Sequence, residues 1–414
     1  MPETLKRQSS DYCLALQPIC DQHLRHVGDE LLYRSSQHAR SAQIEDPLVA
    51  TARVSHMAFY EMGVEALTGS RQLFFNVPRE WLFNPDLLPP VTERVVLEIL
   101  EDIAGDAEVI EALQQIKSLG YCIALDDFVV TQATLPLLDV ADIVKVDVLN
   151  DGIRDADLAI YQSRGLTLLA EKVEDFKTFQ HCRDLGFTLF QGYFYAHPEI
   201  RPSQFNRNGN KTAQLRLLAV LQDENAEFEV LEPLLAQDPQ LCIRLLRLCN
   251  SPLYRRECVI ASLRQAMILV GFSRLRKLIV VVMLADSNPF NQLMLPKALT
   301  RASMCEKLAA ETHADSPDSA FLVGILSMMD ILLEEPLDKL CVQLPLSEEV
   351  KLALLKRQGR LGEILRLTIA FEEARLGSAS QTVVERLNRC YLSSVSWANQ
   401  LLGEVSRSSA DQKS

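Results

Sequence analysis

Two adjacent aspartates end an apolar segment of this chain, a pattern that enzymes use to hold a metal or to do acid–base chemistry. The stretch IALDDFVVT, residues 123–131, runs from apolar residues into Asp126 and Asp127 and then into β-branched residues. Flexible loops over such sites prefer glycine, whereas Val129 and Val130 stand here. The stretch therefore raises the question of whether the aspartate pair still serves a working site.

Other polar residues stand late in further β-rich segments of the first half. They are Glu30, Arg34, Asn76, Glu98, Glu101, Lys145, Asp147, Glu171 and Gln191. Glu30, Asn76 and Glu98, like the aspartate pair, offer hard oxygen donors of the type that suits Mg²⁺ or Mn²⁺. So many anionic oxygens cannot share one site without a cation or raised pKa values, and we expect a pair of divalent ions. Such ions polarise a phosphodiester and activate water, and Lys145 and Glu171 are placed to orient that water and manage its proton.

The elements that must position these residues repeat one theme up to about residue 200. Eight short β-rich segments are separated by polar or helix-like stretches: CLALQPI, DELLYR, QLFFNV, RVVLEIL, CIALDD, DIVKVDV, LTLLAEKV and LFQGYFY. Eight strands alternating with helices predict a closed (β/α)8 barrel of the TIM type, whose active site lies at the carboxyl ends of the strands. An open doubly wound sheet is the competing fold, but no Gly-rich phosphate loop follows the first segment.

The second half of the chain has a helical period instead. Segments such as LCIRLLRLCN and LRKLIVVVML space Leu, Ile and Val at i, i+3 and i+4, which predicts an all-α domain. We expect the barrel domain at 1–200, a linker at 201–212, the helical domain at 213–405 and a flexible tail at 406–414.

Length and composition narrow the classes of function. The chain has 414 residues, 48% of them hydrophobic, and a net charge of -13. We expect no nucleic-acid polymer as a partner, because the average surface would repel it. The N-terminus lacks the apolar run of a secretory signal, and the apolar run 278–285 is too short to span a bilayer. We therefore predict a cytoplasmic protein with no membrane partner, whose 10 cysteines are reduced.

At this point the motifs together resemble the EAL-type cyclic-di-GMP phosphodiesterase domain. Over about residues 13–200, the ordered motifs are ELL within DELLYR, FFNVP, EILE, the aspartate pair, KVD, AEKVE and QGYFY. The resemblance implies that Glu30, Asn76, Glu98, Asp126 and Asp127 hold one or two ions of Mg²⁺ or Mn²⁺. It implies catalytic roles for Lys145, Glu171 and Gln191, and ligand binding by Gln17 and Arg34.

Two departures from the family pattern bear on activity. The family has a glycine-containing loop after the aspartate pair, and Glu101 corresponds to the residue that anchors it. Here the loop reads DFVVTQAT, and because valine resists positive φ we expect the glycine-dependent conformation not to form. The glycine of the family's A-E-G-V-E motif is Lys172 in this chain. Its ammonium could lie near the metals or point outward into solvent, and we expect the second.

The helical half resembles the HDOD domain, a relative of the HD metal-dependent phosphohydrolases, over about residues 205–405. The segments NSPLY and SLRQAMILVGFSRLR carry the resemblance. Ser327 and Met328, in GILSMMD, stand where catalytic HD domains have His and Asp ligands, so we expect this half to be non-catalytic. His313 is interpreted as a surface or capping residue. The basic residues between Arg244 and Lys277 are either solvated helix faces or a docking surface for an acidic partner or for the sister domain.

Three functions remain open on the sequence. The first is a cyclic-di-GMP signalling protein that binds the dinucleotide with weak or conditional hydrolysis and signals through a protein partner of its HDOD domain. The second is a competent cyclic-di-GMP phosphodiesterase, so the enzyme assignment stays open. The third is an adaptor that has lost the ligand. A homodimer is also compatible with the sequence.

Overall fold

The computed structural model describes most of the chain. The described residues are 12–35, 56–149, 153–192, 194, 217, 218, 220, 221, 228–236, 238–254, 260–285, 289–312, 317–333, 336–344, 346–376 and 379–410. They form two compact units. The first consists of the residues up to Phe194 together with Ala370–Leu392, and the second of residues 195–369 together with those from Ser393 onward. The linker predicted at 201–212 and His313 lie outside the described residues, and the linear domain boundaries stay a prediction.

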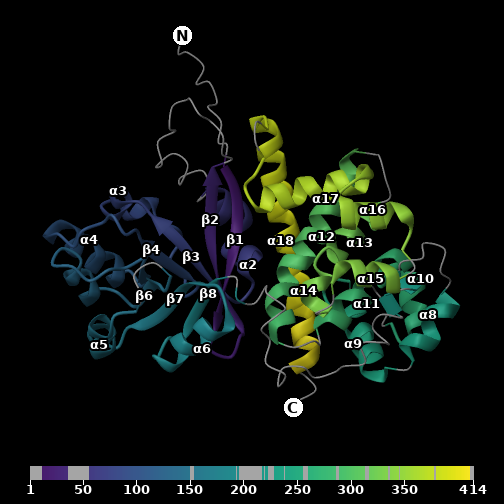
Figure 1. Ribbon diagram of the computed structural model, residues 1–414, viewed down its shortest axis with the longest axis horizontal. Helices are drawn as coiled ribbons and strands as arrows, with labels where there is room; N and C mark the ends of the chain where they lie inside the picture. The colour runs from purple at the N-terminus through teal and green to yellow at the C-terminus, as the bar shows by residue number, and fades with distance from the viewer. Residues whose placement is uncertain are drawn as a thin grey trace, which may run out of the picture. The chain divides into compact units, whose positions relative to one another are not determined.

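Eight strands close a barrel in the first unit (Figure 1). They are β1 (Tyr12–Asp21), β2 (His26–Ser35), β3 (Gln72–Val77), β4 (Val95–Ile99), β5 (Cys122–Leu125), β6 (Ile143–Asp147), β7 (Thr167–Val173) and β8 (Leu189–Gly192). Each strand pairs with its neighbours in chain order, and β8 returns to β1. The predicted closed barrel of eight strands is confirmed, and the strands coincide with the eight β-rich segments of the sequence.

One strand departs from the regular alternation of strand and helix. β1 runs antiparallel to both β2 and β8, whereas β2 to β8 are parallel to one another. The reason is the short connection after β1, in which the Asp21 carboxylate accepts hydrogen bonds from the backbone N–H groups of His23 and Arg25 at 2.8 and 2.9 Å. A tight turn joins antiparallel strands only. As a result Gln17 and Glu30, each near the middle of its strand, lie opposite each other.

A layer of apolar side chains fills the barrel below the polar residues. It consists of Ile19, Phe74, Val96, Ala124, Ile143 and Leu169, all buried. Because side chains two residues apart on a strand point to the same face, the next inward position along each parallel strand lies one level higher. Those positions are Asn76, Glu98, Lys145 and Glu171 on β3, β4, β6 and β7, and Asp126 directly after β5. The polar residues therefore lie directly above this apolar layer, toward the mouth of the barrel.

Helices separate the parallel strands. They are α2 (Val64–Thr68), α3 (Arg79–Leu82), α4 (Ala107–Ser118), α5 (Asp155–Ser163) and α6 (Phe176–Asp184), with a π-helical turn at His56–Met62 and 3-10 turns at Pro85–Leu87 and Leu135–Asp139. Asp106 and Asp175 cap α4 and α6 by accepting hydrogen bonds from the N–H groups of Val109 and Thr178 at 2.9 and 2.8 Å. These caps define where two of the helices between strands begin.

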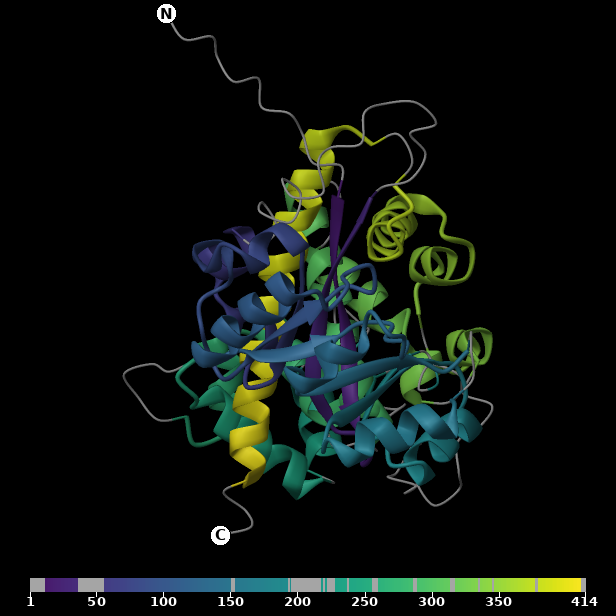
Figure 2. The same cartoon turned by 90° about the vertical axis from the view of Figure 1, so that its left-hand side faces the viewer.

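A segment from the far end of the chain completes the barrel unit. The helix α18 (Gln381–Ala410) contributes its residues up to Leu392 to this unit. The Leu14 N–H donates to Asn388 Oδ1 and the Leu16 N–H donates to Tyr391 Oη, both at 3.0 Å. The start of α18 therefore lies along β1 (Figure 1, Figure 2). Among the described residues β1 pairs with β8 only at residues 19–21, so the two side chains satisfy backbone groups on a strand edge that no described strand covers there.

The second unit is helical throughout its described residues. Its helices are α8 (Phe228–Leu235), α9 (Pro239–Cys249), α10 (Leu263–Val270), α11 (Phe272–Ala285), α12 (Pro289–Thr312), α13 (Pro317–Leu326), α14 (Met329–Leu333), α15 (Leu337–Gln343), α16 (Glu348–Lys356) and most of α17 (Gly359–Glu372), with the rest of α18. At Gly324, a Cβ would come within 2.6 Å of the Ala302 Cα, so glycine permits the close packing of α13 on α12. The predicted all-α second half is confirmed.

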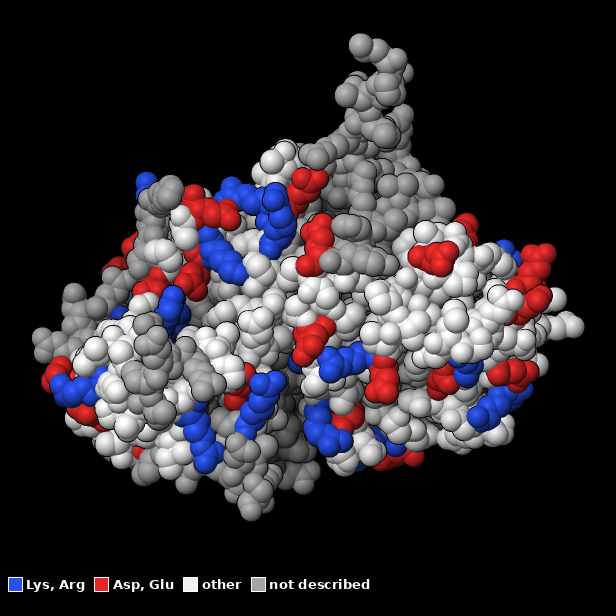
Figure 3. Space-filling view, turned by 180° about the vertical axis from the view of Figure 1, so that it is seen from behind, with Lys and Arg blue, Asp and Glu red and all other residues white. Residues whose placement is uncertain are grey.

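Most of the described basic residues of the helical unit have partners inside that unit. Arg264 pairs with Glu229 and Glu232, and Lys277 pairs with Glu306 and Asp318. Arg244 is buried, while Arg255 and Arg256 lie outside the described residues. On the face shown in Figure 3, basic and acidic side chains alternate instead of gathering into one patch. The described contacts therefore tie these basic residues into their own unit.

Two further expectations concern apolar and sulfur-containing residues. The apolar run 278–285 lies in α11 and is buried from Leu278 to Leu284. In the described part of the chain, no helix combines the length and the apolar character needed to cross a bilayer. The described cysteines are free thiols, most of them buried, as the sequence predicts.

Candidate metal-assisted phosphoester site

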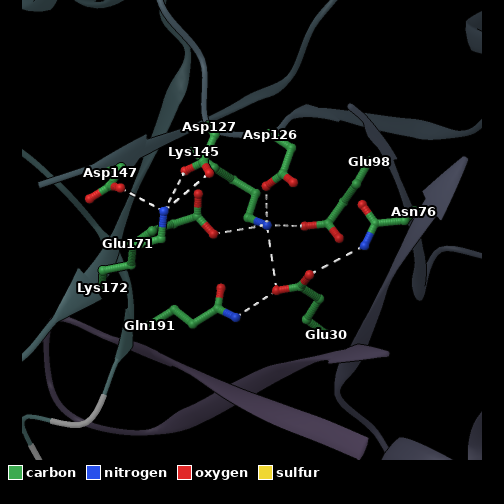
Figure 4. A network of polar contacts seen from close by, with 10 residues as sticks. All are labelled: Glu30, Asn76, Glu98, Asp126, Asp127, Lys145, Asp147, Glu171, Lys172 and Gln191. Atoms are coloured by element: carbon green, nitrogen blue, oxygen red, sulfur yellow. Dashed lines mark hydrogen bonds and ion pairs between the residues drawn. The ribbon is translucent and has the colours of Figure 1, made fainter. Parts of the chain in front are cut away.

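One lysine stands among four carboxylates at the mouth of the barrel (Figure 4). The Lys145 ammonium lies 2.6 Å from Glu98 Oε1, 2.6 Å from Asp126 Oδ1, 3.0 Å from Glu171 Oε1 and 3.5 Å from Glu30 Oε2. The lysine side chain is fully buried, at 0% exposure. We call these five residues the inner cluster. They come from β2, β4, β6 and β7 and from the residue after β5, so the barrel brings together residues that are far apart in sequence.

Two amides hold Glu30 in this cluster. Gln191 Nε2 donates to Glu30 Oε2 at 2.6 Å, and Asn76 Nδ2 donates to Glu30 Oε1 at 3.4 Å. Gln191 is followed by Gly192, whose φ is +153° and where a Cβ would lie 2.0 Å from the Val173 carbonyl oxygen. Only glycine allows β8 to approach β7 so closely, and this approach sets the depth of Gln191 in the mouth.

Burial and mutual repulsion shift the ionisation of the inner cluster. Burial raises the pKa of Glu98 well above its ordinary value, and the charges of Glu30 and Asp126 act in the same direction. Burial raises the pKa of Glu171 to about 8 and also raises that of Asp126, against the effect of the Lys145 ammonium. For Lys145 the surrounding carboxylates outweigh burial and raise the pKa above its ordinary range. The cluster is therefore short of positive charge.

The donor chemistry of the inner cluster fits a divalent cation. Several buried oxygens there accept no hydrogen bond: Asn76 Oδ1, Glu98 Oε2, Glu171 Oε2 and Gln191 Oε1. Glu98 Oε1 lies 2.6 Å from the Lys145 ammonium, but the two groups are not aligned as a hydrogen bond. As the described side chains stand, no three His, Cys, Asp or Glu residues are close enough together to hold one ion, since the carboxylates face the ammonium. Carboxylate and amide oxygens with unused lone pairs are the ligands that Mg²⁺ and Mn²⁺ take.

A second lysine gathers two further carboxylates beside this cluster. The Lys172 ammonium lies 2.6 Å from Asp147 Oδ2 and 3.1 Å from Asp127 Oδ2 (Figure 4). We call these three residues the outer cluster. Burial lowers the pKa of Lys172, but hydrogen bonds to Asp147 and Asp127 outweigh it and raise the pKa above its ordinary range. The expectation that Lys172 points outward into solvent is wrong, because the two aspartates hold its ammonium at the mouth.

The loop after the aspartate pair has a hydrogen-bonded form of its own. The Thr131 N–H donates to Thr134 Oγ1 at 2.9 Å, and Thr134 Oγ1 donates to the Val129 carbonyl at 2.7 Å. No residue from 128 to 134 has a positive φ, so the loop is not one that depends on glycine. Glu101 is exposed and, among the described residues, makes no hydrogen bond or ion pair with this loop.

The remaining candidates are described in part. Gln17 is half-buried on β1 opposite Glu30, at the rim of the inner cluster. The backbone of Arg34 in β2 pairs with that of Cys13 in β1, and the Arg34 side chain is not among the described ones. Sequence reasoning assigned no role to Asp147, and the structure places it against Lys172. The K-x-D spacing was the available signal, since residues two apart on β6 point the same way.

In the helical unit, the residues at the catalytic HD positions have structural contacts. Ser327 Oγ donates to the Gly324 carbonyl at 2.7 Å and accepts from Arg301 Nη1 at 3.1 Å, and Met328 is buried. These two side chains therefore belong to the packing of the helices. The non-catalytic character of this half stays a prediction.

Comparison with known proteins identifies both units. Residues 79–198 match the EAL domain, and residues 211–379 match the HDOD domain. The cyclic di-GMP phosphodiesterase CdgJ of Vibrio cholerae serotype O1 is 33% identical over 380 residues, which are 90% of this chain and 87% of that protein. The chain belongs to the EAL–HDOD family. The EAL match begins after β3, so it does not include the strands that carry Glu30 and Asn76, which close the same barrel.

Two further similarities extend the comparison of this EAL–HDOD chain. The protein YuxH of Bacillus subtilis (strain 168), described as uncharacterized, is 31% identical over 407 residues, 94% of this chain and 98% of that protein. A solved structure described as the Klebsiella pneumoniae BlrP1 manganese/cy-diGMP complex is 24% identical, with a TM-score of 0.37, over 47% of this chain and 57% of that one.

Proposed function

We propose that this protein is a cyclic-di-GMP signalling protein whose EAL barrel binds the dinucleotide together with Mg²⁺ or Mn²⁺ and hydrolyses it slowly or conditionally. The observation that carries the proposal is the inner cluster, in which four carboxylates share one buried ammonium and neighbouring oxygens accept no hydrogen bond. The phosphodiesterase name of the Vibrio cholerae relative supports the choice of ligand. The HDOD domain conveys the signal to a protein partner in the cytoplasm.

The residues that hold the cation are oxygen donors on neighbouring strands. Glu30, Asn76, Glu98 and Asp126 supply them from β2, β3, β4 and the end of β5, and Asp127 is the further candidate. A divalent ion bound there supplies polarisation of a phosphoryl oxygen and a lowered pKa for water. We assign the phosphate contact to Arg34 and a further ligand contact to Gln17.

The chain's own residues handle the attacking water. Glu171 has one oxygen 3.0 Å from the Lys145 ammonium and one buried oxygen without a partner, so it accepts the proton of a water placed beside it. Lys145 orients that carboxylate and stabilises negative charge that develops nearby. Gln191 keeps Glu30 in position. Slow turnover follows from the loop 128–134, whose threonine hydrogen bonds hold it in a form of its own.

A competent phosphodiesterase is the second candidate. The relative that favours it covers both domains at 33% identity and carries that activity in its name. The inner cluster would serve both candidates with the same residues in the same roles, so the rate of turnover separates them.

The deciding experiment is a calorimetric titration of cyclic-di-GMP into the full chain with Ca²⁺, and then with Mg²⁺ or Mn²⁺, followed by chromatography of the nucleotide. The proposal expects binding with every ion and slow formation of linear product with Mg²⁺ or Mn²⁺. Turnover at the rate of an ordinary enzyme, typically ~1–1000 per second, would support the second candidate. No binding would leave an adaptor that acts through protein contacts alone.

Two variants with the same change of charge sharpen this experiment. Glu171→Gln removes the proton acceptor, and we expect loss of product with binding retained. Glu174→Gln makes the same change on an exposed side chain three residues later, and we expect no effect. An equal loss in both variants would contradict the role of Glu171.

A further inference from the structure

The outer cluster is built on an unusual backbone. Lys172 has a φ of +56° and Asp127 a φ of +40°, in the left-handed region that residues other than glycine rarely adopt. Such conformations cost free energy and persist only where their surroundings impose them. Two left-handed residues, one in β7 and one in the loop after β5, thus meet in one ion pair at 3.1 Å.

The pairing of β7 explains how the lysine reaches the mouth. β7 pairs with β8 at Leu169 and Ala170, the register then shifts, and pairing resumes between Val173 and Gly192. Glu171 and Lys172 occupy the irregular stretch. On a regular strand, neighbouring side chains point to opposite faces, but an irregularity of this kind turns a side chain to a new direction. Both side chains therefore reach the mouth, Glu171 toward Lys145 and Lys172 toward Asp147 (Figure 4).

The two clusters differ in their balance of charge. In the inner cluster one ammonium serves four carboxylates, and buried oxygens there accept no hydrogen bond. In the outer cluster one ammonium serves two carboxylates, and three of its contacts are hydrogen bonds. The inner cluster therefore has the larger excess of carboxylates over ammonium groups, and a further cation would be attracted there.

We infer that the Lys172 ammonium takes the place of a second divalent ion at Asp127 and Asp147, so that this barrel binds a single divalent ion, at the inner cluster. The inference rests on the proposed function, because it concerns how many ions accompany the dinucleotide. Lys172 is a positioning residue. It holds the Asp127 carboxylate in place and lowers the number of divalent ions that the site can bind.

Geometry makes the ammonium and a second ion competitors. A divalent ion coordinated by Asp127 would lie about 2.0–2.6 Å from a carboxylate oxygen. The Lys172 ammonium is already 3.1 and 3.4 Å from the two oxygens of that carboxylate. The ion and the ammonium would use the same lone pairs and repel each other at close range. A second ion therefore requires that Lys172 leave both aspartates.

The test counts Mn²⁺ ions bound to the full chain without nucleotide, by equilibrium dialysis with metal analysis and by electron paramagnetic resonance. We expect one Mn²⁺ per wild-type chain, with the spectrum of an isolated ion. Lys172→Gly and Lys172→Asn remove the cation and tolerate the left-handed backbone. In both we expect a second Mn²⁺, bound at least tenfold more tightly than in the wild type, and a spectrum broadened by two neighbouring ions. Lys172→Arg keeps the cation and should bind one.

The outcomes separate this inference from the proposed function. Two Mn²⁺ ions in the wild type, or one in all four proteins, would overturn the role of Lys172 while leaving the metal-dependent barrel intact. Glu98→Gln should lose the Mn²⁺ ion of the inner cluster. If the wild type and Glu98→Gln both bind no Mn²⁺, the proposed function itself fails. Circular dichroism of each variant confirms that a change in the count is not a loss of fold.

Discussion

Lys145 is the residue on which the inner cluster depends. Its ammonium is fully buried and neutralises part of the charge of four carboxylates that the strand spacing brings to one level of the barrel. A buried lysine in apolar surroundings would lose its proton, whereas here the carboxylates keep it charged. The residue can therefore serve the fold and the chemistry with the same positive charge.

Removing that charge should be costly when no other cation is supplied. Lys145→Met leaves buried carboxylates without a partner, and loss of one member of a buried ion pair costs about 3–5 kcal/mol. We expect a fall of this size in the free energy of unfolding of the barrel in chelator, with part of it recovered in Mn²⁺. Lys351→Met, which breaks an exposed pair with Glu348, should cost less than about 1 kcal/mol. Equal losses, or no recovery in Mn²⁺, would contradict this account.

The pKa of Glu171 predicts a dependence of stability on pH in the metal-free protein. Below its ordinary pKa of 4.5 the carboxyl is protonated in both the folded and the unfolded chain. As the pH rises toward about 8, the unfolded chain releases this proton and the folded barrel keeps it, so stability falls across that window. Glu171→Gln stays neutral and should escape this loss. Thermal melts in chelator should show its advantage over wild type growing from pH 5 to about 8, while Glu174→Gln shows none.

At the scale of the element, the loop 128–134 shows how a local hydrogen-bond pattern can replace a glycine-dependent one. Thr131 and Thr134 bond reciprocally, and Thr134 also holds the Val129 carbonyl. The Gly105 N–H fixes the loop from outside by donating to the Ala133 carbonyl at 2.9 Å. The loop can be changed without touching the inner cluster.

Restoring glycine to this loop should increase turnover. With Val129 and Thr131 both replaced by glycine, the loop loses a threonine hydrogen bond and gains access to positive φ. We expect the rate of linear product formation in Mn²⁺ to rise by on the order of tenfold, equivalent to about 1.4 kcal/mol in the barrier. Thr134→Ser, which keeps the hydroxyl, should match the wild type. An unchanged rate with binding intact would exclude the loop as the cause of slow turnover.

The start of α18 is the second element with a measurable role. Asn388→Ala leaves the buried N–H of Leu14 unpaired, and Tyr391→Phe does the same for Leu16. An unsatisfied buried donor costs about 1–3 kcal/mol, so each change should lower the free energy of unfolding of the barrel by that order in denaturant titration. Arg389→Ala, on the exposed side of the same helix, is the control and should be close to neutral. Losses no larger than the control's would show that the edge of β1 has another partner.

The sequence predicts the helices, the strands and the inner cluster better than it predicts the contacts of Lys172 and of the start of α18. Strand alternation places Asn76, Glu98 and Lys145 two positions beyond interior apolar residues, so their convergence can be read from spacing once the barrel is assumed. The direction of Lys172 depends on an irregularity between β7 and β8 that has no local signal in the sequence. The bond between Leu14 and Asn388 joins residues 374 positions apart, and no periodicity reports such a pairing.

At the scale of the whole molecule, the barrel unit is assembled from two separate parts of the chain. Residues up to Phe194 supply the strands, and Ala370–Leu392 join them from the far end. Phe371 and Tyr391, both from this later part, pack with ring centroids 5.4 Å apart. An EAL barrel cut out at its linear boundary would therefore lack a part of its own compact unit.

This composition predicts that the barrel can be complemented in trans. A fragment of residues 1–194 should unfold at a lower temperature than the barrel in the full chain. Adding a peptide of residues 370–392 should raise its melting temperature in proportion to the logarithm of the peptide concentration above the dissociation constant. The same peptide with Asn388→Ala and Tyr391→Phe should have a much smaller effect. No response to either peptide would mean that the strands are complete without this segment.

The edge of β1 also has a consequence for the order of events during synthesis. β1 leaves the ribosome long before Asn388 and Tyr391, which emerge only after nearly the whole helical unit has been made. At roughly 5–20 residues per second, the nascent barrel waits on the order of ten seconds or more with the Leu14 and Leu16 donors unsatisfied. Exposed strand edges invite pairing with other chains, and during this interval the edge of β1 is open to such pairing. The late helix thus delays completion of the first domain until the helical unit has been synthesised.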